Sequence, residues 1–138
     1  MVTRRGFAAC GLCAALGLTA SKVNAQSGTA PTGGVTRHVL HRVDLPGSSY
    51  EDVLVFAEIE AGTIVDWHTH PGIESAYVVE GEGELMVKGV SNRNLKASEG
   101  FQVPAETPHS LRNGSRPMKL AITYTVEKGK PLASPASA

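Results

Sequence analysis

From residue 35 onward the chain consists of short runs of apolar and polar residues, separated mostly by glycine, proline or asparagine. Successive side chains of a strand point to opposite faces of a sheet, so alternation is typical of a strand with one buried face. In residues 52–60, for example, Val53, Val55, Ala57 and Ile59 share one face. No later stretch shows helical spacing of apolar residues over ten or more positions. The pattern therefore predicts an all-β barrel or sandwich.

Nine runs fit this description, and together they predict one domain over residues 35–128 of the 138-residue chain. We predict strands at 36–43, 52–60, 63–68, 74–80, 83–88, 92–96, 100–103, 109–113 and 119–127. The turn Gly81-Glu82-Gly83 joins two of them, which we expect to form a hairpin. Residues 26–34 and 129–138 are rich in Gly, Pro, Ser, Thr or Ala, so we expect a flexible leader and a flexible tail.

Residues 1–25 resemble an export signal. The segment 3–7 (Thr-Arg-Arg-Gly-Phe) is similar to the twin-arginine signature, and the apolar stretch after it is shorter than the ~20 residues of a spanning helix. Residues 23–25 (Val-Asn-Ala) end in the small residue that a signal peptidase reads. We predict cleavage after Ala25 and a periplasmic or secreted protein. The alternative is an uncleaved N-terminal anchor.

Net charge and cysteine content limit which partners we expect and which atoms could hold a metal ion. The net charge is +0, and residues 26–138 carry 10 basic against 13 acidic groups without a basic cluster. We therefore expect neither nucleic acid nor, after cleavage, an anionic membrane as a partner. Cys10 and Cys13 lie in the export signal, where we interpret them as small apolar residues; the alternative is a redox or metal-binding C-x-x-C pair. Any metal in the mature chain must then be held by nitrogen and oxygen.

Three histidines and one glutamate form a coherent set of metal ligands. His68 and His70 are two residues apart in an expected strand, so their side chains face the same side. Pro71-Gly72 then turns the chain, and Glu74 opens the next strand. His109 begins a later strand. Imidazole suits Zn, Fe, Cu and Ni, whereas a carboxylate adds the hard oxygen that suits Mn and Fe. The alternative is that these histidines are ordinary polar residues of a sheet.

The spacing of these residues resembles the two motifs of the cupin family. The first motif, G(X)5HXH(X)3,4E(X)6G, is matched at every fixed position by Gly62, His68, His70, Glu74 and Gly81. The second, G(X)5PXG(X)2H(X)3N, is matched by Pro104, His109 and Asn113, but Ser98 and Glu106 stand where the family has glycine. The resemblance implies a small jelly-roll β-barrel that holds one metal through His68, His70, Glu74 and His109. It also implies a homodimer.

The resemblance, together with export, favours an exported metal-dependent enzyme that acts on a small-molecule substrate. We expect dioxygenase-type oxidation, in which the metal binds substrate and dioxygen at adjacent open positions. The alternatives are an isomerase, decarboxylase or lyase, and a non-catalytic module that binds a small ligand or a metal. Twin-arginine substrates generally cross the membrane folded, and folding in the cytoplasm would trap Mn(II) or Fe(II) first. We therefore favour Mn(II) or Fe(II), with Zn, Ni or Cu as alternatives.

Other polar residues are weaker candidates. Glu106 can act as a general base beside the metal or can be a solvent-facing turn residue. Gln102 and Tyr77 can hydrogen-bond a ligand or can serve packing and surface roles. His38 and His41 are three residues apart, so we expect them on opposite faces, in structural or solvated positions.

Overall fold

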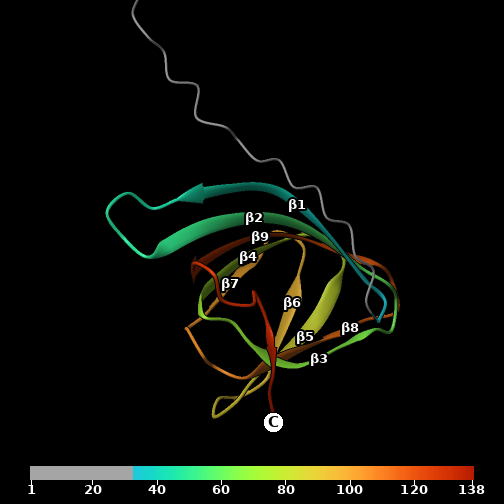
Figure 1. Cartoon of the computed structure of the whole chain (residues 1–138). Helices are drawn as coiled ribbons and strands as arrows, with labels where there is room; N and C mark the ends of the chain where they lie inside the picture. The colour runs from blue at the N-terminus through green and yellow to red at the C-terminus, as the bar shows by residue number, and fades with distance from the viewer. Residues whose placement is uncertain (1–32) are drawn as a thin grey trace, which may run out of the picture.

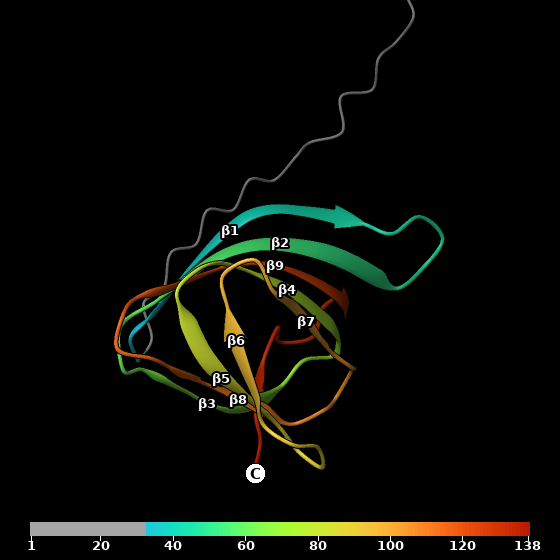
Figure 2. The same cartoon turned by 180° about the vertical axis from the view of Figure 1, so that it is seen from behind.

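The computed structural model describes residues 33–138, which form two facing five-stranded sheets without a helix (Figures 1 and 2). The predicted export signal, with Cys10 and Cys13, and most of the leader lie outside these residues. The strands are β1 (Val35–Asp44), β2 (Tyr50–Ile59), β3 (Ile64–Thr69), β4 (Gly72–Glu80), β5 (Glu82–Val87), β6 (Arg93–Lys96), β7 (Gly100–Val103), β8 (His109–Asn113), β9 (Met118–Glu127) and β10 (Ser134–Pro135). Within this range, no helix is present that is long and apolar enough to cross a bilayer.

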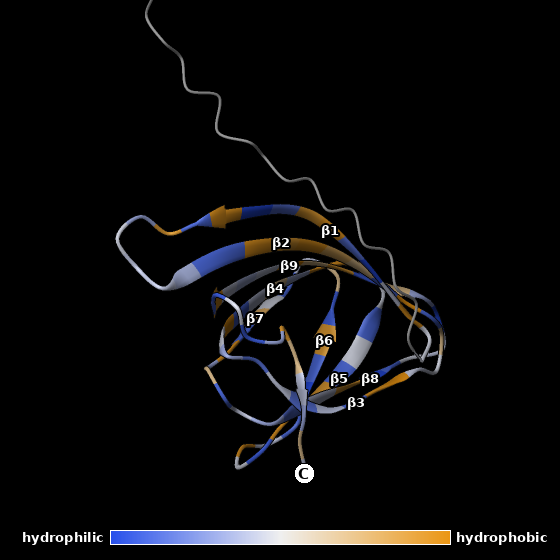
Figure 3. Cartoon of the chain, viewed as in Figure 1, coloured by the Kyte–Doolittle hydropathy of each residue, from blue (hydrophilic) through white to orange (hydrophobic). Residues whose placement is uncertain are grey.

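All strand pairs are antiparallel, and the two sheets bury their facing sides in one core. The first sheet has the order β1-β2-β9-β4-β7, and the second has the order β10-β3-β8-β5-β6. Figure 3 shows the apolar stretch of β2 in orange, and its inward residues Val53, Val55, Ala57 and Ile59 are at most 3% exposed. The prediction of a small all-β jelly roll is therefore confirmed.

The predicted hairpin at Gly81-Glu82-Gly83 is wrong. β4 pairs with β7 and β9 in the first sheet, whereas β5 pairs with β6 and β8 in the second. The chain crosses between the sheets at Gly81, whose φ of 89° belongs to the left-handed region. A Cβ at Gly81 would lie 2.6 Å from the carbonyl oxygen of Pro117, so the crossing needs glycine. A tight glycine turn between two strands does not show whether they pair with each other.

The expectation that His38 and His41 face opposite sides is also wrong. The register between β1 and β2 shifts between Val39 and His41, which leaves Leu40 as an extra residue. His38 therefore lies opposite Phe56, and His41 lies opposite Leu54, on the outer face of the first sheet. His38 Nε2 is 3.2 Å from Glu58 Oε2, and His41 is exposed.

Part of the expected flexible tail has a defined place in the fold. The segment after β9 leads from the first sheet to the edge of the second, where β10 pairs Ser134 with Thr69 and Pro135 with His68 (Figures 1 and 2). The backbone N–H of Ala136 also donates to the carbonyl oxygen of Trp67. Alternation cannot reveal a two-residue strand, and Ser and Pro disfavour the prediction of one.

The two departures from the second motif keep the backbone conformation that glycine would adopt. Ser98 has φ 72° and Glu106 has φ 54°, and these are the two non-glycine residues with positive φ between residues 33 and 138. The backbone N–H of Glu106 donates to the carbonyl oxygen of His70 over 2.9 Å. The loop before His109 therefore contains a left-handed turn with a strained, non-glycine residue in it.

Replacing Glu106 by glycine tests this strain. Glycine removes a left-handed penalty of about 1 kcal/mol, which offsets the entropy it adds to the unfolded chain. We expect Glu106→Gly to leave the free energy of unfolding unchanged or to raise it by up to about 1 kcal/mol in urea titrations. The matched control, Ala105→Gly in the same exposed turn, should lower it by about 0.5 kcal/mol. Equal losses in the two variants would contradict the interpretation.

Candidate metal centre

His68 and His109 come together because β3 and β8 are neighbours. The two histidines are direct cross-strand partners, and their ring centroids lie 4.2 Å apart. The register between these strands shifts between Val65 and His68, and Ser110 Oγ donates to the carbonyl oxygen of Val65 across the irregularity over 2.7 Å. The hydroxyl therefore ties the strands together next to both imidazoles.

His70 and Glu74 lie on the two sides of a crossing between the sheets. His70 follows the end of β3, and Pro71 leads into β4, where Glu74 points inward between Val103 and Tyr124. A Cβ at Gly72 would lie 2.0 Å from the carbonyl oxygen of Thr125, so only glycine allows β4 to approach β9 this closely. The crossing brings an imidazole of one sheet against a carboxylate of the other.

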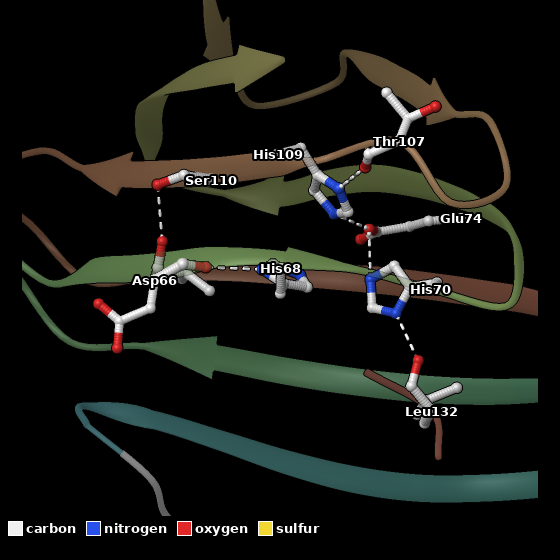
Figure 4. A network of polar contacts seen from close by, with 9 residues as sticks. Asp66, His68, His70, Glu74, Thr107, His109, Ser110 and Leu132 are labelled. Atoms are coloured by element: carbon white, nitrogen blue, oxygen red, sulfur yellow. Dashed lines mark hydrogen bonds and ion pairs between the residues drawn. The ribbon is translucent and has the colours of Figure 1, made fainter. Parts of the chain in front are cut away.

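The four predicted ligands form one compact group inside the barrel (Figure 4). One ligand atom of each residue can be chosen so that all four atoms lie within 4.8 Å of one another. Glu74 Oε2 is 2.9 Å from His109 Nε2 and 3.1 Å from His70 Nε2. His70, Glu74 and His109 are buried, and His68 is partly exposed toward a cavity.

Three backbone carbonyls fix the orientation of the three imidazoles. The Nδ1 atoms of His68, His70 and His109 lie 2.7, 2.6 and 2.9 Å from the carbonyl oxygens of Asp66, Leu132 and Thr107, respectively (Figure 4). A carbonyl only accepts hydrogen bonds, so each Nδ1 must carry the proton and donate it. In the neutral ring the lone pair is then on Nε2. All three histidines are thus prepared to bind through Nε2.

The group fits a divalent metal ion. The Nε2 atom of His70 is buried and has no well-aligned hydrogen-bond partner within residues 33–138, although Glu74 Oε2 is 3.1 Å away. A buried acceptor pair of this kind is costly unless a cation or a proton lies between the atoms. Three imidazole nitrogens and one carboxylate form a donor set for a first-row transition metal, and the carbonyls provide the outer hydrogen bonds typical of such sites.

The pKa shifts reflect burial and the contacts with Glu74. Burial raises the pKa of Glu74, but the contacts with His109 and His70, whose rings can donate to the carboxylate when protonated, outweigh it and lower this pKa to about 2. Burial lowers the pKa of His68 to about 4, against its bond to the Asp66 carbonyl. Burial also lowers the pKa of His109, but its bonds to Glu74 and the Thr107 carbonyl reverse this, so that the net shift is upward. The carboxylate is therefore ionised, and His68 is neutral, at neutral pH.

Two cavities meet at the histidine group. A narrow inner cavity of about 30 Å³ is lined by His68, Glu74 and His109 together with apolar side chains such as Phe101. A wider cavity of about 480 Å³ reaches the surface past His68 and His70, and Leu132 and Pro135 of the C-terminal segment form part of its wall. The wider cavity has the size of a small-molecule site, whereas the inner one has room only for water-sized molecules.

Three groups near the metal ligands were missed by the sequence analysis. Tyr124 is the cross-strand partner of Glu74, and its ring centroid is 4.6 Å from that of His70. Arg37 lines both cavities. Its position in phase with the apolar residues Val35 and Val39 was a signal that it faces the core. The role of the Leu132 carbonyl cannot be predicted from the sequence, because every residue has a backbone carbonyl and none is marked by its residue type.

The weaker candidates lie away from the ligand group. Tyr77 is 49% exposed on the outer face of the first sheet, because the inward positions of β4 belong to Glu74 and Ala76. Gln102 lies on the same outer face and donates to Ser75 Oγ over 3.0 Å. The side chain of Glu106 is exposed and lines neither cavity. Strand alternation and a turn direct these three side chains away from the site.

Removing one ligand should abolish tight metal binding. We expect the wild-type protein to bind one equivalent of Mn(II) or Zn(II), and His109→Ala to weaken binding by at least about 100-fold, because loss of a ligand costs more than loss of an outer hydrogen bond. Titration calorimetry and elemental analysis measure this. The control is His41→Ala, which removes an exposed histidine of the outer face and should bind metal as the wild type does. Equal affinities in the two variants would contradict the assignment.

The metal-free protein should be most stable near pH 6.5. The folded-state pKa of His68 is about 4, so the unfolded chain binds more protons between pH 4 and 6.5, and stability falls as the pH is lowered through this window. The folded-state pKa of His109 is raised, so its contribution is lost as the pH rises above 6.5. Urea titrations across this range measure both limbs. In His68→Ala, the free energy of unfolding should change less between pH 4.5 and 6.5 than it does in the wild type. The same pH dependence in both proteins would contradict burial of the His68 imidazole as the cause of the loss at low pH.

Comparison with known proteins agrees with this architecture. The family model described as "Cupin domain" matches residues 55–126, and no curated protein matches the chain. A solved RmlC-like cupin from Shewanella frigidimarina is 24% identical with a TM-score of 0.61, and the match covers 77% of this chain and 89% of that one. Polyketide cyclase RemF from Streptomyces resistomycificus is 19% identical with a TM-score of 0.59, covering 76% and 72%.

A third similar structure is the DMSP lyase DddQ from Ruegeria pomeroyi, which is 22% identical with a TM-score of 0.56. That match covers 64% of this chain and 44% of the lyase, so the chain spans less than half of the lyase's length. At these identities the three structures show a shared fold only. The family model, in contrast, covers more than half of the chain and includes all four predicted ligands. The protein therefore belongs to the cupin family.

Proposed function

We propose that the protein is a metal-dependent enzyme that acts on a small organic molecule, with dioxygenase-type oxidation as the leading reaction. The observation that carries the proposal is the set of three carbonyl-oriented imidazoles and one carboxylate next to a cavity of about 480 Å³. A bound Mn(II) or Fe(II) ion would supply Lewis acidity and a centre at which substrate and dioxygen can react. A purely structural metal site would not need an adjoining cavity of this size.

The protein's own groups control the surroundings of that centre. The apolar walls of the inner cavity keep bulk water away from His109 and Glu74, which strengthens electrostatic interactions there. Burial first and the charge of Glu74 second raise the pKa of Tyr124, against the effect of Arg37. The phenol therefore stays protonated and can donate a hydrogen bond to an oxygen atom of a bound molecule.

A non-redox reaction is the second candidate. The buried neutral phenol of Tyr124 beside the ligand group would suit a lyase, isomerase or decarboxylase that stabilises an enolate-like charge. Two of the similar structures are a DMSP lyase and a polyketide cyclase, which supports considering this chemistry. A module that binds a ligand or metal without turnover is the remaining alternative.

Three further predictions from the sequence belong to this proposal. They are export by a twin-arginine route, Mn(II) or Fe(II) as the resident metal, and a homodimer.

Elemental analysis followed by oxygen uptake tests the proposal. We expect protein purified from the periplasm without a tag to contain Mn or Fe, and to consume O₂ with a catechol, flavonol or diketone panel. His68→Ala should lose at least about 99% of this activity, since it removes a ligand of the centre. His38→Ala, on the outer face of the first sheet, is the matched control and should keep it.

The outcomes separate the candidates. Substrate turnover without O₂ uptake would contradict the proposed oxidation and favour the non-redox reaction. Ligand-dependent thermal stabilisation without turnover would indicate a binding module. Stoichiometric Zn or Cu, with almost no Mn or Fe, would contradict the proposed metal.

A further inference from the structure

Arg37 is a cation on the inner face of the barrel. On β1 it alternates in phase with buried Val35 and partly buried Val39, and its cross-strand partner Ala57 is 2% exposed. It is the only arginine or lysine between residues 33 and 138 that lines either cavity at the metal ligands. Arginine is seldom placed on the apolar side of a sheet unless its charge has a partner.

Within the described part of the chain, no carboxylate forms an ion pair with Arg37. The ion pairs present involve other residues, and the buried carboxylate of Glu74 is within 3.1 Å of two imidazole nitrogens instead. Asp66 also lines the wider cavity, but its carboxylate points away from the histidine group (Figure 4). The guanidinium of Arg37 lies near the Tyr124 phenol and is only partly buried, so its charge remains available to an anion from outside the chain.

The charge of the inner cavity leads to the same conclusion. Its lining has one negative group, Glu74, and one positive group, Arg37, which cancel while the imidazoles are neutral. A divalent ion held by the four ligands would therefore leave this lining with a net charge of two positive units. A low-dielectric site with excess positive charge favours an anionic ligand over a neutral one of the same shape.

We propose that Arg37 binds the carboxylate of the substrate, which makes small organic acids the substrate class of this site. The inference rests on the proposed function, because it places the reacting part of that acid at the metal ligands. Arg37 and His68 line both cavities, so a molecule in the wider cavity can reach the guanidinium and the ligand group together. The planar guanidinium can hold a carboxylate with two parallel hydrogen bonds, which fixes the orientation of the acid as well as its charge.

Binding of matched acids and amides tests the proposal. Benzoate and benzamide, and propanoate and propanamide, have nearly the same shape within each pair and differ in charge. Calorimetric titrations use wild-type protein in metal-loaded and in metal-free form. We expect at least one acid to bind about 10- to 100-fold more tightly than its amide in both forms, because a charge-assisted pair is lost in the amide. The metal-free form excludes a carboxylate that simply ligates the ion.

Variants of Arg37 test whether this residue causes the preference for the acid over the amide. Arg37→Met should remove the 10- to 100-fold preference for the acid, and Arg37→Lys should keep part of it. Arg42→Met, on the same strand but exposed and paired with Glu51, is the matched control and should keep all of it. If Arg37→Met does not fold, Arg37→Lys and the wild-type acid-to-amide ratio still decide the question.

The results distinguish failure of this inference from failure of the proposed function. Wild-type protein that binds metal but prefers neither acid would overturn the role of Arg37 alone, as would an undiminished preference in Arg37→Met. Protein that binds no metal but prefers an acid through Arg37 would overturn the metal-dependent function and retain the anion site.

Discussion

A backbone carbonyl oxygen accepts a hydrogen bond and cannot donate one, and the geometry of the candidate metal centre depends on three such oxygens. They hold the Nδ1 protons of His68, His70 and His109, and so direct three Nε2 lone pairs toward one carboxylate. Glu74 Oε2 lies 2.9 Å from His109 Nε2 and 3.1 Å from His70 Nε2, and these atoms repel one another unless a proton or a metal cation lies between them. The barrel therefore maintains an arrangement that is unfavourable for an apolar core and suitable for a cation.

The three carbonyls belong to different parts of the fold, which explains why the barrel must close before the site exists. Asp66 is on β3, Thr107 is in the loop before β8, and Leu132 is in the segment between β9 and β10. Glu74 comes from the opposite sheet, at a crossing that requires Gly72. Local structure alone could not produce this geometry. Packing of the two sheets supplies the free energy that holds repelling polar groups together.

The sequence predicted what depends on side-chain pattern. Alternation located nine of the ten strands, and the spacing of His68, His70, Glu74 and His109 predicted a group that the structure brings together. What depends on backbone geometry was not predictable. The extra residue Leu40 reversed the face of His41, and the turn at Gly81 joined strands of different sheets. The outward position of Tyr77 was predictable, because strand alternation counted from Glu74 places it on the outer face.

The contribution of Leu132 to the site is made by its main chain, and this limits what substitution experiments can detect. Every replacement at position 132 keeps a carbonyl oxygen, so the hydrogen bond to His70 can survive a complete mutational scan of the segment. Shortening the chain is a different perturbation, because it deletes the acceptor and leaves the His70 ring free to change tautomer. Fusion partners and purification tags at this end therefore lie close to the histidine group, next to a segment in which Leu132 and Pro135 line the wider cavity.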